Sequence, residues 1–293
     1  NNADKPAEEK ERIDTPKHLG KFNWLGETTH PGIKLTHSLL AAYASSPVEG
    51  IQLATNQVWH WLQGVKDCCL VVGMRKGEGW KFYSDADWAG MYGINHDPRS
   101  RTGGYICYDG FPIMWISTYQ NCRGTQYKEG YDVALSSCES ETYAAADVTK
   151  MIQHLQHLAD EMEIDFPKPA VLYVDSESAI AYVRRTGGGG KMRHIDMRAA
   201  WLQLLKDRKL VEFGSIKGTE NPADFFTKIY SRKEFKLAHS RIMGKLPKFL
   251  CRSREPANIT EDGKSSGDGI PLPDIEDLGT SAHDKVSKRS ICA

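Results

Sequence analysis

The sequence lacks a net charge, a metal-binding cysteine pattern and any long apolar segment. Its 293 residues contain 38 basic and 38 acidic side chains, so a nucleic-acid partner would have to meet local positive charge. The seven cysteines form no C-x-x-C pair and have no histidine spacing suited to zinc, which indicates reduced thiols in an intracellular protein. No apolar run approaches the roughly 18 residues of a membrane span, which argues against a membrane protein. The chain also lacks an initial Met, which indicates a fragment or a processed product.

The composition changes twice along the chain. Residues 1–20 and the tail 253–293 are charged and poor in large apolar side chains, so both are predicted to be disordered. Residues 21–78 are predicted to be helical, because apolar residues recur at helical spacing between 33 and 66. The informative region is 79–232, which is predicted to be one α/β domain followed by a helical extension at 233–252.

Residues 79–117 are typical of three consecutive antiparallel strands. The first is expected to end at Ser84, within YSDADWAG, which places the carboxylates of Asp85 and Asp87 just beyond it. Aromatic and β-branched runs then flank Asp109-Gly110, a pair that favours a type I′ hairpin turn. The second and third strands are therefore predicted on either side of this turn.

An apolar stripe with i, i+3, i+4 spacing predicts a helix from about Cys138 to Met162 that packs on the sheet. Extending the stripe backward by one turn reaches Glu141, which should point toward the end of the sheet. Glu139 falls off the stripe and fits a capping box with Ser136, so its carboxylate is expected to bond to the backbone. Considered alone, Glu141 is explained equally well as an acid favoured by the positive helix N-terminus.

Two further acids follow strand-like runs. Asp175 ends the continuous apolar run 170–174, which is typical of a strand buried on both faces, and a short helix follows it. Asp224 lies in the first turn of a final helix that is predicted to start at Asn221 and Pro222. Each acid alone can be a capping or helix-start residue. Together they stand in a β-β-β-α-β-α-β-α order that indicates one shared site.

In this order the chain resembles the ribonuclease H domain of copia-type retrotransposon (retrovirus-related) Pol polyproteins. The matching segments, between about 79 and 230, are YSDADWAG, RSRTGGY, WIS, LSSCESETYAAA, LYVDSESAI, KMRHIDMR and NPADFFTK. The resemblance implies a ribonuclease H-like fold, with a mixed five-stranded sheet and helices on both faces. Residues 18–75 resemble the end of the reverse transcriptase part of the same polyproteins, so 21–78 would be a remnant of that region.

The resemblance also implies a hydrolase that cuts the RNA strand of RNA/DNA hybrids endonucleolytically. The family's acidic positions carry over to Asp85, Glu141, Asp175 and Asp224, as catalytic residues and metal ligands. Two Mg²⁺ ions, with Mn²⁺ as the alternative, would activate a water and stabilise the leaving oxygen. Carboxylates suit Mg²⁺, and their crowding is expected to destabilise the metal-free site. Asp87 shares the strand parity of Asp85 and stays an alternative first ligand.

A local basic segment agrees with a nucleic-acid substrate. Between residues 181 and 209, eight basic side chains stand against two acidic ones, a net charge of +6, although a solvated helix face would look the same. The expected partners are the hybrid and the reverse transcriptase and integrase portions of the same polyprotein, in a cytoplasmic virus-like particle or in the nucleus. The candidate nucleic-acid contacts are Arg184, Arg185, Lys191, Arg193, His194 and Arg198.

Two other functions stay open. A catalytically inert relic that binds nucleic acid would fit the long connection 121–134 and Thr118-Tyr119, which stand where the family carries lysines. A DNA-strand transferase on the same fold would use three acids and leave Asp224 dispensable. The glycine run 187–190 follows a helix and lacks the order of a phosphate-binding loop, so it is interpreted as a hinge.

Overall fold

The protein is built on one mixed five-stranded sheet, in the order β3-β2-β1-β4-β5. The computed structural model describes residues 9–45, 48, 50–68, 70, 77–92, 97–120, 133–185 and 193–243. The antiparallel strands are β1 (Trp80–Asp87), β2 (Arg101–Tyr108) and β3 (Phe111–Tyr119), and β4 (Ala170–Val174) and β5 (Val211–Ser215) continue the sheet in parallel from β1. This strand order confirms the predicted ribonuclease H-like α/β fold.

The hairpin between β2 and β3 turns at the predicted position. Asp109 and Gly110 both have positive φ, 47° and 76°, as the two central residues of a type I′ turn require. β1 extends beyond the predicted end at Ser84, because the next three residues stay paired with β2 as far as Asp87 opposite Arg101. Asp85 therefore projects from a strand and not from a loop.

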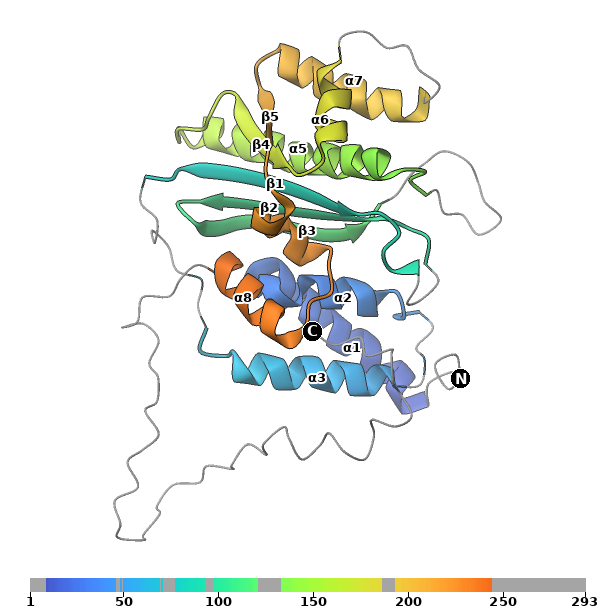
Figure 1. Ribbon diagram of the computed structural model, residues 1–293. Helices are drawn as coiled ribbons and strands as arrows, with labels where there is room; N and C mark the ends of the chain where they lie inside the picture. The colour runs from blue at the N-terminus through green and yellow to red at the C-terminus, as the bar shows by residue number, and fades with distance from the viewer. Residues whose placement is uncertain are drawn as a thin grey trace.

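Three helices cover one face of the sheet: α5 (Ser137–Glu161), α6 (Glu177–Arg184) and α7 (Arg193–Asp207) (Figure 1). Large apolar side chains from the sheet and from α5 form the main core between these layers, among them Phe82, Val148, Ile152, Leu172 and Phe213. Burial of each such side chain contributes on the order of 1.5–3 kcal/mol, so this core fixes α5 against the sheet. The position of Glu141 follows from that packing.

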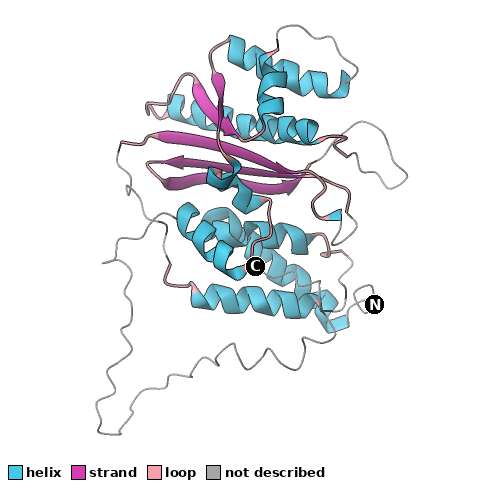
Figure 2. Ribbon diagram, in the orientation of Figure 1, coloured by secondary structure: helices cyan, strands magenta, loops and turns pink. Residues whose placement is uncertain are grey.

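The opposite face carries α1 (Glu9–Thr28), α2 (Lys34–Ala41), α3 (Ile51–Gly64) and α8 (Arg232–Ile242) (Figures 1 and 2). Helix α1 corrects the prediction of disorder for residues 9–20. Leu19 and Phe22 are buried in a cluster with apolar residues of α2 and α3, such as Leu40 and Leu62. These distant helices supply the burial that offsets the ordering entropy, and the composition of residues 1–20 alone cannot reveal it.

The helical N-terminal segment packs directly against the sheet. The indole Nε1 of Trp115 on β3 donates to the carbonyl oxygen of Gly26 at 2.6 Å, and Arg101 on β2 donates to the hydroxyl of Ser38 at 2.7 Å. The predicted boundary at 78/79 thus separates two segments that share an interface.

Residues 233–242 of the predicted extension lie in α8, whereas 244–252 and the predicted disordered tail 253–293 lie outside the described residues. None of the described helices is long and apolar enough to cross a membrane.

Deleting residues 1–78 is expected to destabilise the remaining domain by several kcal/mol, because it uncovers Trp115 and takes away Trp61, the aromatic partner of Phe235. Thermal and urea unfolding followed by circular dichroism would measure the change. A chain that ends at residue 252 is the control, since the tail is predicted to be disordered. Equal stability of the 79–293 fragment and the whole chain would show that the helical segment is an independent attachment.

Candidate active site

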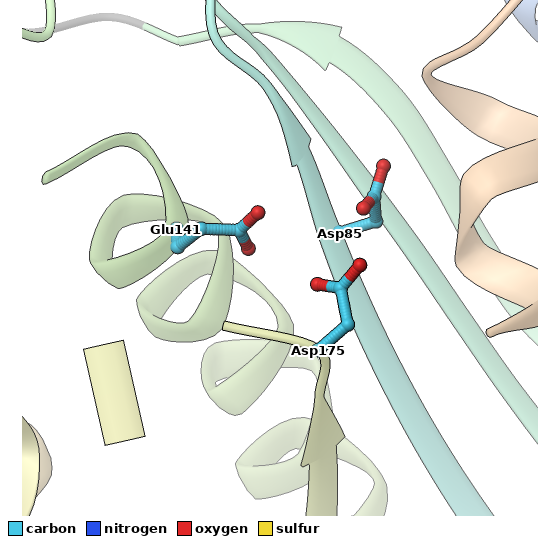
Figure 3. Close-up of side chains that lie close together, drawn as sticks. All are labelled: Asp85, Glu141 and Asp175. Atoms are coloured by element: carbon cyan, nitrogen blue, oxygen red, sulfur yellow. The ribbon is translucent and has the colours of Figure 1, made fainter. Parts of the chain in front are cut away.

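Three of the predicted acids meet at one end of the sheet. β1 and β4 run parallel with Phe82 opposite Leu172, and continuing this register places Asp85 level with Asp175. Glu141 reaches the same place from the second turn of α5. One carboxylate oxygen from each acid lies within 4.8 Å of the other two, and Figure 3 shows the three side chains pointing toward one another.

The fourth acid, Asp224, adjoins this group from the short 3₁₀ helix η4 (Pro222–Phe226). Asn221 caps η4 as predicted, but the segment is a 3₁₀ helix of only five residues, and α8 begins separately at Arg232. The side-chain amide of Asn221 also donates to the carbonyl oxygen of Ser84 at 2.9 Å, which ties η4 to β1. On the far side of η4, the hydroxyl of Thr227 donates to the Asp85 carboxylate.

A glycine on β2 lets η4 approach the sheet so closely. Gly103 lies opposite Asp85 across the β1–β2 pair. A Cβ atom at this position would lie 2.6 Å from Cγ2 of Thr227 and 2.7 Å from the carbonyl oxygen of Ala223. Because real Cβ atoms do not approach other atoms so closely, any larger residue would displace η4 and with it Asp224.

Gly103→Ala is therefore expected to destabilise the protein by about 1–3 kcal/mol and to lower divalent-metal binding by moving Asp224 and Thr227. Thermal unfolding and calorimetric titration with Mn²⁺ would check both effects. Gly20→Ala in α1 is the matched control: no atom lies within 4 Å of its added Cβ, so a gain of up to about 1 kcal/mol is expected there. A Gly103→Ala protein as stable as the parent chain would contradict the close approach.

The neighbouring acids have local structural partners. Asp87, the alternative first ligand, accepts a hydrogen bond from the backbone of Gly90 in the turn after β1. The carboxylate of Glu139 accepts the backbone N–H of Leu135 at 2.7 Å and the hydroxyl of Tyr143 at 2.8 Å, which confirms the predicted backbone bond. These contacts leave Asp85 and Glu141 as the members of each pair that face the cluster.

Burial and mutual repulsion favour the protonated form of every acid in the site. Burial, followed by the charges of Asp85 and Asp175, raises the pKa of Glu141 to about 9. Burial and then the charge of Asp224 raise the pKa of Asp85 to about 6. The pKa values of Asp175 and Asp224 are also raised, chiefly by burial. Without a cation, Glu141 therefore retains its proton at neutral pH, as expected among crowded carboxylates.

The donor set fits a hard divalent cation. Three buried carboxylate oxygens, Oε2 of Glu141, Oδ1 of Asp175 and Oδ1 of Asp224, have no hydrogen-bond partner within the described residues. No His or Cys belongs to the cluster in this part of the chain. Mg²⁺ and Mn²⁺ prefer oxygen ligands of this kind, whereas zinc sites normally include nitrogen or sulfur. Bound cations would supply the missing partners and the missing positive charge.

Known proteins resemble this chain over most of its length. A stretch of 224 residues, 75% of the chain, is 30% identical to part of the retrovirus-related Pol polyprotein from transposon TNT 1-94 of Nicotiana tabacum. A stretch of 218 residues, 74% of the chain, is 26% identical to the corresponding polyprotein from transposon RE2 of Arabidopsis thaliana. The chain is a relative of the copia-type Pol polyproteins. It spans only about 15% of the length of these relatives, and no protein-family model matches it.

Among solved structures, this chain is similar to LC11-RNase H1, isolated from compost, with 15% sequence identity and a TM-score of 0.35. The similarity covers 50% of this chain and 91% of that protein. The strand order and the pairing of β1 with β2 and β4 define the fold of this chain.

The residues predicted to contact nucleic acid do not form one group in the structure. Some contact other parts of the protein, and others are exposed or lie outside the described residues. Arg184 donates to the carbonyl oxygen of Phe213 at 2.6 Å, and the Arg198 guanidinium lies 4.1 Å from the centre of the Tyr143 ring. Arg185 follows α6 and is exposed. Arg193 and His194 lie in the first turn of α7, and Lys191 lies outside the described residues, as do most of loop 121–134 and the glycine run.

Two residues of the site were missed by sequence reasoning, although both lie in the quoted segment NPADFFTK. Thr227 bonds to Asp85, and Lys228 lies 2.8 Å from Asp224. Lys228 follows Asp224 by four residues, a spacing at which opposite charges commonly pair on one face of a helix. That spacing was the available signal for Lys228. No signal in the sequence identifies Thr227, because its contact with Asp85 crosses 142 residues of chain.

Proposed function

We propose that this Pol relative is a metal-dependent ribonuclease H that hydrolyses the RNA strand of RNA/DNA hybrids. The observation that carries the proposal is the convergence of Asp85, Glu141 and Asp175, in which buried carboxylate oxygens of Glu141 and Asp175 lack partners among the described residues. A structural acid at a helix start or strand end would satisfy both oxygens locally, as Glu139 does. The relationship to copia-type Pol polyproteins supports the choice of reaction.

In this proposal the four acids are the ligands of the metal ions. Two bound Mg²⁺ ions, or Mn²⁺ in their place, would activate a water and stabilise the leaving oxygen of a phosphodiester. Asp85, Glu141 and Asp175 would hold them, and Asp224 would complete the set from η4. Because Glu141 retains its proton in the metal-free protein at neutral pH, it must release that proton when it becomes a ligand.

The substrate class comes from the family resemblance. A hybrid would be recognised through backbone shape and 2′-hydroxyls and not through base sequence. Arg185, exposed at the end of α6, is the described candidate for a phosphate contact on the basic segment. The reverse transcriptase and integrase portions of the same polyprotein are the proposed protein partners.

Substrate selectivity tests the proposal. The full chain would be incubated with Mg²⁺ and four labelled substrates: RNA/DNA hybrid, double-stranded RNA, double-stranded DNA and single-stranded RNA. We expect cleavage of the RNA strand of the hybrid alone, and none after chelation of the metal. Hybrid binding without cleavage would instead favour an inert relic. DNA cutting or joining that survives Asp224→Asn would favour a strand transferase.

A further inference from the structure

Lys228 places a positive charge inside the acidic site. Its Nζ atom lies 2.8 Å from Oδ2 of Asp224 and 3.7 Å from Oδ1 of Asp85. The side chain is 44% exposed, so it has solvent on one side and the acids on the other. Burial alone would lower the pKa of this ammonium group, but the charges of Asp85 and Asp224 outweigh burial and raise the pKa. The group is therefore charged at neutral and mildly alkaline pH.

This one charge acts on the whole cluster. It lowers the pKa of each of the four acids, against the burial that raises them: Asp85, Glu141, Asp175 and Asp224. A single positive charge cannot neutralise four carboxylates, and all four pKa values stay raised. Lys228 is thus a partial substitute for the charge that divalent ions would bring.

The backbone around Lys228 is fixed independently of the ammonium group. The Lys228 N–H donates to the carbonyl oxygen of Asp224 at 3.0 Å, and the hydroxyl of Thr227 donates to the Asp85 carboxylate. The flexible four-carbon stem can therefore swing into solvent without moving Asp224 or the turn that carries it.

On the basis of the proposed metal-dependent function, we propose that Lys228 is a competing cation. It holds Asp85 and Asp224 in the metal-free protein and leaves them when a divalent cation binds. Mg²⁺ binds oxygen ligands at about 2.0–2.1 Å, so an ion on the same carboxylates would force an ammonium group at hydrogen-bond distance into strong like-charge repulsion. The lysine thereby sets the cation concentration at which the site fills.

If Lys228 only formed an ordinary surface ion pair, its replacement would have a different effect. Pairs of partly exposed charges contribute little to stability, so removing a merely structural lysine would change the melting temperature slightly and leave metal affinity unchanged. The distinguishing quantity is the dissociation constant for the metal, which needs no measurement of activity.

Calorimetric titration of the full chain with Mn²⁺ and Mg²⁺ at pH 8.5 tests the proposal. We expect Lys228→Met to bind the metal about five- to tenfold more tightly than wild type, and Lys228→Arg to bind it as wild type does. The control is Lys168→Met, because Lys168 lies at the same 2.8 Å from Asp160 and is 48% exposed, but is not among the charges that shift the pKa values of the cluster. Circular dichroism would verify that each variant is folded.

The possible outcomes distinguish failure of the competing-cation proposal from failure of the proposed ribonuclease function. If wild type and Lys228→Met bind the metal with the same affinity, the proposed role of the lysine is overturned and the ribonuclease proposal stays intact. Binding by Lys228→Met alone would support a lysine that excludes the metal. Absence of binding in both folded proteins would overturn the metal site itself, and the competing cation with it.

Discussion

Replacing Asp85 with Asn is expected to reduce metal-dependent cleavage by about 10³-fold or more, because it removes a charged ligand from the centre of the cluster. Asp85 is nearly inaccessible to solvent and faces both Thr227 and Lys228. Burial raises its pKa to about 6, so a neutral amide at this position should not destabilise the metal-free protein. Single-turnover cleavage and thermal unfolding, measured on the same protein, would separate lost chemistry from lost structure.

Asp87→Asn is the matched control for this change. The two acids are two residues apart on the same strand, but Asp87 caps the turn at Gly90. We expect the Asp87 variant to keep most of its cleavage rate and to lose at most about 1–2 kcal/mol of stability. A reversed result, with Asp87→Asn inactive and Asp85→Asn active, would assign the first ligand position to Asp87.

Glu141→Gln is expected to stabilise the metal-free protein at pH 7. The folded protein keeps the Glu141 proton up to a pKa of about 9, whereas the unfolded chain releases it near the ordinary value of 4.5. Between these values the folded state binds more protons than the unfolded state, so the free energy of unfolding falls as pH rises. The cost reaches about 3 kcal/mol at pH 7, and a neutral glutamine removes it.

Urea unfolding between pH 5 and 9 measures this linkage. Wild type should lose stability across the range, while Glu141→Gln should show a much smaller slope. Mg²⁺ should stabilise wild type most at high pH, where the carboxylates give up their protons most readily. Glu139→Gln serves as the control, because Glu139 caps the helix and its loss should destabilise the protein by about 1 kcal/mol. A wild type that becomes more stable toward pH 9 would contradict the raised pKa.

Local patterns were sufficient to predict much of the sheet and helix α5. The Asp109-Gly110 turn, the start of α5 and the division between Glu139 and Glu141 all depend on residues a few positions apart. Turn chemistry and capping are short-range, so one sequence contains what is needed to predict them. The inclusion of Asp175 in the site followed from its place at the end of an apolar strand and from the family resemblance, and the parallel pairing of β1 with β4 brings it beside Asp85.

The features that sequence reasoning missed depend on contacts between distant segments. The first turns of α1 were assigned to disorder, because the burial of Leu19 and Phe22 is supplied by α2 and α3. The shortness of η4 and the contact between Thr227 and Asp85 depend on how η4 packs over Gly103, which only the folded chain brings together. Propensity and spacing describe single elements and say little about such approaches.

The measurement that tests the central claim most directly is single-turnover cleavage of an RNA/DNA hybrid, labelled on each strand in turn, by the full chain in Mg²⁺ beside Asp175→Asn. The account predicts that wild type cuts only the RNA strand and that the variant, folded and still able to bind the hybrid, cuts it at least about 10³-fold more slowly. Equal cleavage by the two proteins would contradict it, because the Asp175 carboxylate at the end of β4 would then take no part in the chemistry.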